Sequence, residues 1–179
     1  MKIIGTFIDD QYPNIGHDHL RVSARAIVIN DLNQIALTHI QADDHFGHRD
    51  YYELPGGGVH PNESIYRAVQ REIIEELGFE TRLVAEIGEV HDFYNLIKQE
   101  NRSLYFILKC ANFCGNNLQP RESRLIKEII WVTLKDALTL YENMQDELVG
   151  RLVKQRELPV LREALLVLEE KTEQENISH

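Results

Sequence analysis

The stretch LPGGGVHPNESIYRAVQREIIEELGF, residues 54–79, decides how the rest of this chain is interpreted. It opens with a proline and three glycines, Gly56 to Gly58, which let the backbone approach a ligand closely and adopt positive φ angles. A helical pattern follows over residues 64–77 and ends at Gly78, a typical C-cap residue. Glycine-rich turns that enter a helix can present backbone groups to phosphate or metal, although any tight strand-to-helix turn also uses glycine.

The predicted helix carries carboxylates on the side that should be buried. At about 100° per residue, its apolar residues from Ile65 to Leu77 centre at roughly 20–60°. Glu76 and Glu72 fall at about 20° and 340°, inside or beside that stripe, and Glu75 lies at about 280°. A solvated acidic face fits this placement poorly, and like charges at i and i+4 cost stability unless a cation compensates them. Arg71 alone leaves the cluster negative, so hard divalent cations such as Mg²⁺ suit these oxygens.

These residues resemble the signature of the Nudix hydrolases. In that signature a glycine is followed by five residues and a glutamate, here Gly57 and Glu63. Seven residues later the chain reads REIIEELGF, residues 71–79, which matches every fixed position. Phe79 takes a final place that is usually aliphatic, and ELPG, residues 53–56, resembles the usual lead-in. We call residues 57–79 the Nudix box.

The resemblance implies an α/β fold, a Nudix-type α/β/α sandwich with a mixed β-sheet in which the box forms a loop and a helix. The Nudix domain would span residues 20–145, with an N-terminal strand and loop extension at 1–19 and a C-terminal helical extension at 146–179. The remaining patterns suit that fold, with a polar loop expected at residues 41–50. We expect strands near residues 3–8, 20–29, 34–40, 51–54, 80–93, 102–114 and 126–132, and helices at 134–143 and from Pro159 to about Glu173.

The resemblance also implies a catalytic and metal-binding site. The implied metal ligands are the backbone carbonyl of Gly56 and the carboxylates of Glu72, Glu75 and Glu76. Glu63 would pair with Arg71 and orient this acidic cluster. Mg²⁺ is the implied cofactor, with Mn²⁺ as a substitute, and the general base stays open between Glu72 and Glu75.

Some relatives supply one more acid from a loop beyond the box. Glu122 is the best-placed candidate for a further metal ligand here, and Glu128 is the alternative. A solvated loop glutamate, with no role in the site, is the favoured interpretation of Glu122.

The candidate substrate-binding residues are Arg25, Arg49, Gly57 and Tyr94. The two arginines could contact phosphates or lie at the surface or core edge, and the tyrosine could stack on a base or belong to the core. His39 stands where relatives that act on oxidised nucleotides often carry arginine, which weighs against oxidised dGTP. No proline occurs near residue 94, which weighs against ADP-ribose, and Tyr94 itself weakly favours dinucleoside polyphosphates.

The implied reaction is metal-dependent hydrolysis of the pyrophosphate bond of a nucleoside diphosphate linked to another moiety, as in Nudix pyrophosphohydrolases. The alternative is a non-catalytic Nudix-fold domain that senses nucleotides, but such domains usually lose box glutamates that this chain keeps. The isomerase that shares this fold and acts on isopentenyl diphosphate needs a suitably placed cysteine, and Cys110 and Cys114 are not where we expect it.

Composition limits the partners and the compartment. A net charge of −10 over 179 residues disfavours nucleic acid and anionic membranes as partners. The small nucleotide-type substrate is what the Nudix resemblance implies. We find no apolar run long enough to span a membrane and no signal-peptide core, so we expect a cytoplasmic protein with two buried, reduced cysteines. The predicted helix from Pro159 could pack on the domain or form a homodimer interface.

Overall fold

The structure, a computed structural model, describes residues 1–115 and 125–177. The described strands are β1 (Ile3–Phe7), β2 (His19–Ile29), β3 (Ile35–Asp44), β4 (Gly47–Glu53), β5 (Gly56–Gly58), β6 (Phe79–Tyr94), β7 (Gln99–Phe113) and β8 (Ile126–Val132). The described helices are α1 (Ile65–Leu77), α3 (Leu134–Asn143) and α4 (Leu148–Ile177), with a 3-10 turn at Asn95–Ile97.

The described strands form one mixed sheet. Its order is β1-β6-β7-β2-β3-β4, with β5 paired to β2 and β8 paired to β3. The pairs β1/β6 and β2/β7 are parallel, and the others are antiparallel. The central strand β2 therefore pairs with β7, β3 and β5, and its side chains lie on both faces of the sheet.

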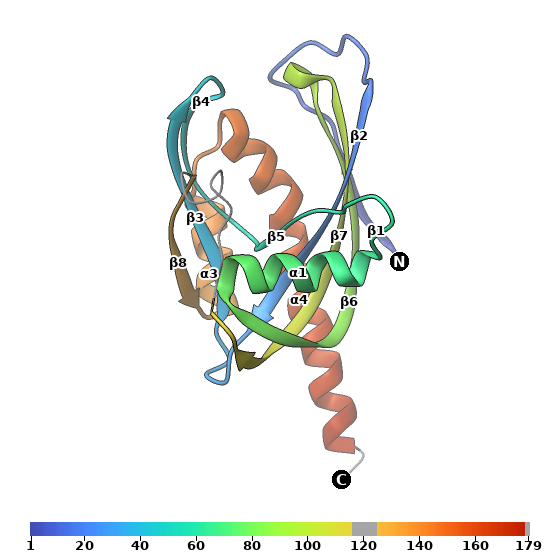
Figure 1. Cartoon of the computed structure of the whole chain (residues 1–179), viewed down its shortest axis with the longest axis vertical. Coiled ribbons are helices and arrows are strands. Elements are labelled where there is room, and N and C mark those ends of the chain that lie inside the picture. Colours follow the sequence, from blue (N-terminus) through green and yellow to red (C-terminus); the bar gives the residue numbers. More distant parts are fainter. Residues whose placement is uncertain (116–124, 178–179) are drawn as a thin grey trace.

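Alternation along β2 separates two hydrophobic cores. Ala24, Ala26 and Val28 belong to the core under α1, whereas Ile27 belongs to the core under α3 and α4. Figure 1 shows α1 crossing one face of the sheet and α4 running behind the other. The predicted α/β/α sandwich is confirmed. Because Arg25 lies between two residues that face α1, its side chain points toward α4.

Helix α1 follows the sequence pattern closely. The hydroxyl of Ser64 accepts a hydrogen bond from the backbone N–H of Arg67, which caps the N-terminus. Gly78 ends the helix in the left-handed conformation at φ 75°, and its N–H donates to the carbonyl of Ile74. The helix buries two of its glutamates beside its apolar residues, as its periodicity predicts.

The predicted loop at residues 41–50 is wrong, because most of it forms the β3–β4 hairpin. The pairing runs from Thr38 opposite Glu53 to Asp44 opposite Gly47. Opposite charges face each other across these strands, with Arg49 Nη2 lying 2.9 Å from a carboxylate oxygen of Asp44. Such cross-strand pairs stabilise a polar hairpin that shows little of the hydrophobic alternation typical of strands.

The last helix is longer than predicted. It begins at Leu148 rather than at Pro159, and the proline lies inside it. Leu152 and Val153 precede the proline and are buried, as are Val160 and Leu161 after it. Packing on both sides of the proline therefore outweighs the roughly 3 kcal/mol that proline costs in a helix interior. The helix packs on the domain, its C-terminal end extends beyond the sheet (Figure 1), and the homodimer stays a prediction.

The prediction of two buried cysteines is wrong. Cys110 is partly exposed and Cys114 is exposed, and both are free. They lie near the end of β7, where Phe113 is also largely exposed. In residues 1–115 and 125–177, no helix is both long and apolar enough to cross a membrane.

Candidate active site

The glycines of the lead-in and box bring the backbone of β5 against β2 and α1. Gly56 lies opposite Arg25 in the sheet, and its N–H donates to Glu76 Oε2 at 2.9 Å. Its φ is +133°, and a Cβ there would lie 2.4 Å from the carbonyl oxygen of Ala24. A Cβ on Gly57 would lie 2.6 Å from both carboxylate oxygens of Glu72. Glycine is thus required at 56 by the backbone and at 57 by the carboxylate of α1.

Arg71 organises the acidic edge of α1, as the resemblance implies. Its Nε and Nη2 atoms donate to the two carboxylate oxygens of Glu63 at 2.9 and 3.0 Å. Its Nη2 also donates to the carbonyl of Gly58, while Nη1 donates to Glu72 at 2.7 Å and to Glu75 at 3.3 Å. The hydrogen bonds from Arg71 lower the pKa of Glu63 to about 2, so this pair stays ionised.

Two of the three glutamates on α1 are buried. Glu72 and Glu76 are only 5% and 6% exposed, whereas Glu75 is partly exposed. Burial raises the pKa of Glu76 well above its ordinary value, and the nearby carboxylate of Glu53 raises it further. Arg25 and the Gly56 N–H oppose this effect without cancelling it. A cation beside Glu76 would offset the cost of keeping these groups ionised.

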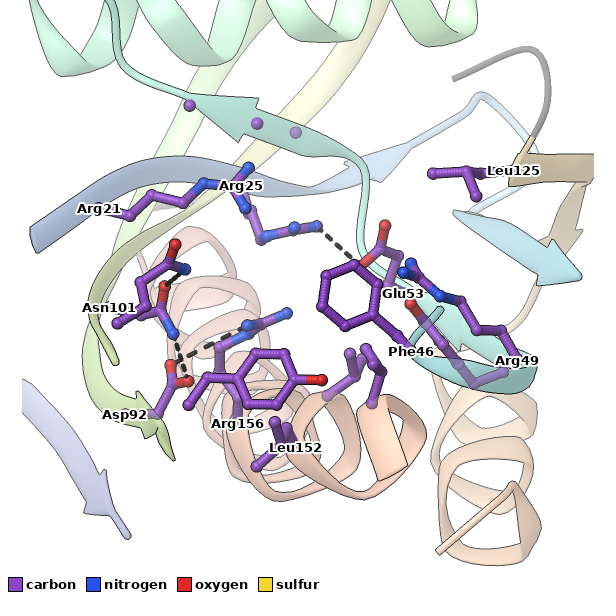
Figure 2. Close-up of a pocket in the computed structure, with 18 of the residues that line it drawn as sticks. Arg21, Arg25, Phe46, Arg49, Glu53, Asp92, Asn101, Leu125, Leu152 and Arg156 are labelled. Carbon is purple, nitrogen blue, oxygen red and sulfur yellow. Dashed lines mark hydrogen bonds and ion pairs between the residues drawn. The ribbon is translucent and has the colours of Figure 1, made fainter. Parts of the chain in front are cut away.

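A pocket of about 550 Å³ opens beside these carboxylates. Gly56, Gly57, Glu72 and Glu76 form part of its wall, and residues of β2, β4, β6, β7 and α4 complete most of the rest. Arg25 enters from β2 and Arg156 from α4, on opposite sides of the space shown in Figure 2. The other polar or aromatic side chains of the wall include Arg21, Phe46, Arg49, Glu53, Asp92, Tyr94 and Asn101.

The candidate substrate-binding residues all line this pocket. Arg25 is 7% exposed, donates to the carbonyl of Leu54 at 2.6 Å and lies 3.5 Å from Glu53. Arg49 is equally buried, and its guanidinium carbon lies 4.9 Å from the ring centroid of Phe46. Both arginines therefore lie in the pocket wall rather than on the open surface. Tyr94 is also buried, with its ring centroid 6.1 Å from that of Phe46, and burial raises its pKa to about 12.

Of the two candidates for an extra metal ligand, only Glu128 lies in the part of the chain that the structure describes, and it does not line the pocket. Glu122 lies outside the described residues. Glu128 lies on β8, where its carboxylate is 3.1 Å from Nδ1 of His39. The other ring nitrogen of His39 lies 2.7 Å from Asp50, so this histidine belongs to a polar cluster on the β3–β4–β8 surface.

Sequence reasoning missed several residues of the wall. Glu53 is the first residue of the lead-in, and the sequence gives no sign that its side chain lines a pocket. Asp92 and Asn101 lie opposite each other on β6 and β7, a pairing that their sequence separation conceals. Arg156 lies on α4, before the proline at which the helix was expected to begin. The signal that could have indicated Arg156 is helical periodicity continued before Pro159, which places this charged residue beside the apolar stripe of the helix.

Comparison with known proteins agrees with this geometry. A family model described as the NUDIX domain matches residues 19–152. The chain belongs to the NUDIX family. A Bacillus subtilis (strain 168) protein named "Putative 8-oxo-dGTP diphosphatase" is 42% identical over 65 residues, which make up 36% of this chain and 40% of that protein. The chain thus matches well under two thirds of that relative's length.

Solved Nudix structures show the same fold. The NUDIX hydrolase from Nitrosomonas europaea is 18% identical, with a TM-score of 0.62, and the match covers 82% of this chain and 88% of that one. The MutT protein from Methanosarcina mazei Go1 is 20% identical, with a TM-score of 0.58, and the match covers 89% and 96% of the two chains. At these identities the likeness concerns the fold alone.

The residues of the lead-in and of the Nudix box fit a hard divalent cation. The Gly56 backbone and the side chains of Glu53, Glu72 and Glu76 border one pocket, and their ligand atoms are all oxygens. In residues 1–115 and 125–177, no group of three His, Cys, Asp or Glu side chains is close enough to form a ready-made cation site. Arg71 instead contacts the oxygens of Glu72 and Glu75. Burial raises the pKa of Glu76, and a bound cation would lower that pKa and keep the carboxylate ionised.

Proposed function

We propose that this Nudix protein hydrolyses the pyrophosphate bond of a nucleoside diphosphate linked to another moiety, with Mg²⁺ or Mn²⁺ as its cofactor. The observation that carries the proposal is the burial of Glu72 and Glu76 in the wall of a pocket that also holds the Gly56 turn and four arginines. Carboxylates placed there without a cation would repel a phosphate. With a cation, the same oxygens and arginines suit a bound diphosphate.

The residues of the lead-in and of the Nudix box then have distinct tasks. The carbonyl of Gly56 and the carboxylates of Glu72, Glu75 and Glu76 would hold the metal, which neutralises phosphate oxygens and lowers the pKa of bound water. The Arg71 pair with Glu63 fixes the acidic edge of α1. Of the two candidates for the general base, Glu72 lines the pocket, which supports it over Glu75.

The remaining pocket would take the group beyond the scissile bond. Phe46 and Tyr94 provide aromatic surface, and Arg49 lies against the first of these rings. On another side, Asp92 accepts a hydrogen bond from Asn101 at 2.9 Å through Oδ2. Its buried Oδ1 lies 4.0 Å from Nη1 of Arg156 but makes no hydrogen bond to described residues. A buried acceptor without a hydrogen bond costs free energy, which supports a polar substrate group at this position.

The identity of that group is open to a direct test. The name of the Bacillus subtilis relative points to 8-oxo-dGTP. The histidine at position 39 weighs little against it, because His39 pairs with Asp50 and Glu128 instead of facing the pocket. Dinucleoside polyphosphates, which the tyrosine at position 94 weakly favours, remain the second class to examine.

The experiment is a substrate panel with nucleoside triphosphates, oxidised deoxynucleotides, ADP-ribose, nucleotide sugars and dinucleoside polyphosphates. Each compound is incubated with Mg²⁺, with Mn²⁺ and with chelator, using the native protein and Glu76→Gln. We expect metal-dependent release of nucleotide and phosphate from one class, and its loss in the variant. Tight nucleotide binding without any turnover would instead favour the sensing domain.

We further propose that the protein acts in the cytoplasm, as a monomer or homodimer, on small nucleotides and without nucleic acid or membrane partners. Two free cysteines suit a reducing compartment, and the charge of −10 opposes binding to polyanions.

A further inference from the structure

Glu157 is a buried carboxylate that lies outside the Nudix box and contacts its lead-in. It lies on α4, is 0% exposed, and projects from the same side of the helix as the buried Val153 and Val160. Its Oε2 atom accepts hydrogen bonds from the backbone N–H of Leu54 at 2.7 Å and from the hydroxyl of Tyr141 at 2.6 Å. A carboxylate inside an apolar stripe is the same feature that marks Glu76 on α1.

The other oxygen of Glu157 faces two arginines of the pocket. Oε1 lies 3.4 Å from Nη2 of Arg156 and 3.8 Å from Nε of Arg25. Arg25 in turn donates from Nη1 to the carbonyl of Leu54 at 2.6 Å. Both backbone polar groups of Leu54 are therefore held by side chains, one from β2 and one from α4, and these side chains form an ion pair with each other.

Hydrogen bonds hold the backbone of each residue in the turn that leads into the box. The carbonyl of Pro55 accepts from the N–H of Ala26, and the N–H of Gly56 donates to Glu76. A continuous set of contacts thus runs from Glu157 through residues 54–56 to the buried glutamate of α1. The carbonyl of Gly56, a metal ligand in the proposed function, is two residues from the N–H that Glu157 holds.

We propose that Glu157 is a positioning residue of the active site, which holds the Leu54–Gly56 turn and Arg25 in the geometry that metal binding requires. The inference rests on the proposed function and extends it to α4. Burying an ion pair is often no more stabilising than apolar packing of similar volume, so stability alone is a weak reason for a carboxylate here. Its contacts instead link α4 to the backbone that presents the Gly56 carbonyl.

The substitution Glu157→Gln tests this proposal with little change of shape. A glutamine amide has one acceptor and one donor end. If its oxygen faces Leu54, its NH₂ faces the two arginines; if it is turned round, its NH₂ faces the N–H of Leu54. Either orientation sets one donor against another. It removes either the acceptor of the Leu54 N–H or the carboxylate oxygen that faces Arg25 and Arg156.

Tyr141→Phe is the matched control. It removes one hydrogen bond to the same carboxylate oxygen but leaves the contacts of Glu157 with Leu54 and the arginines in place. The first measurement is Mn²⁺ affinity of the substrate-free proteins by electron paramagnetic resonance, with melting temperatures recorded alongside. The second measurement is kcat and KM of the native protein and both variants as a function of Mg²⁺ concentration.

We expect Glu157→Gln to weaken Mn²⁺ binding about 10- to 100-fold, the range seen when partners of metal ligands are removed. Tyr141→Phe should lower the melting temperature while keeping the native affinity. Native affinity in Glu157→Gln, or equal weakening in both variants, would overturn the inference while native turnover left the proposed function intact. A native protein that neither bound Mn²⁺ nor hydrolysed any substrate would refute the proposed function, and this inference with it.

Discussion

Replacing Gly57 by alanine should disable the site without unfolding the protein. The added Cβ would lie 2.6 Å from both oxygens of the Glu72 carboxylate, whereas ordinary contact begins at 3.4 Å. The carboxyl carbon would lie nearest, at 2.5 Å, so the carboxylate must move by about 0.9 Å to restore ordinary contact. It can do so, because it is the end of a flexible side chain. A misplacement near 1 Å at a catalytic group can cost about 100-fold in rate, and we expect a fall in kcat/KM of that order.

The neighbouring glycines make this prediction specific. A Cβ on Gly58 would meet nothing within 4 Å, so Gly58→Ala should keep both its activity and its melting temperature. A Cβ on Gly56 would press on the backbone of Ala24 and Arg25 at a φ of +133°, so Gly56→Ala should lose stability as well as activity. The assay is steady-state hydrolysis at saturating Mg²⁺, with thermal unfolding of each variant. Native activity in Gly57→Ala would refute the placement of Glu72 beside the box turn.

Three further substitutions test other parts of the pocket. Burial raises the pKa of Glu76 above its ordinary 4.5, so without metal the folded state loses stability as pH rises from that value through the pKa of the folded state. In chelator, Glu76→Gln should therefore have a higher melting temperature than the native protein at pH 8 and the same melting temperature at pH 4. Equal melting temperatures at pH 8 would contradict this. Arg25→Met removes the arginine that Glu53 and Glu157 share. Urea unfolding should show the free energy of unfolding lowered by about 3–5 kcal/mol. A loss below about 1 kcal/mol would show that the cluster is well solvated. Asp92→Asn should raise KM with kcat nearly unchanged, because the described contacts of Asp92 are with Asn101 and Arg156 and not with the proposed metal ligands. A fall in kcat alone would place it at the reacting bond.

The acidic end of the site could be predicted from the sequence because it is local. Glu72, Glu75 and Glu76 share one helix with Arg71, and helical geometry alone fixes how they cluster. Burial of Glu72 and Glu76 follows from the same periodicity that buries the apolar residues of α1. The Glu63–Arg71 pair lies within the same short segment, so it too required only the box.

The far side of the pocket could not be predicted, because its residues meet only through the tertiary fold. Asp92 and Asn101 become neighbours through the register of β6 and β7, and Arg156 reaches them from α4. Pro159 concealed that helix, since the packing of residues before it cannot be seen in a local pattern. The polar β3–β4 hairpin was concealed for a similar reason, as its cross-strand ion pairs lack the alternation of apolar residues.

Phosphorus-31 NMR of the native protein with the best substrate of the panel tests the central claim most directly. If the buried glutamates of α1 support metal-dependent cleavage of a pyrophosphate, the coupled diphosphate signals should decay with Mg²⁺ present. Two products should appear in their place, each ending in a phosphate on its side of the broken bond. The same samples with chelator, or with Glu76→Gln, should stay unchanged. Persistent diphosphate signals in the native protein with Mg²⁺, or equal decay in chelator, would contradict the account.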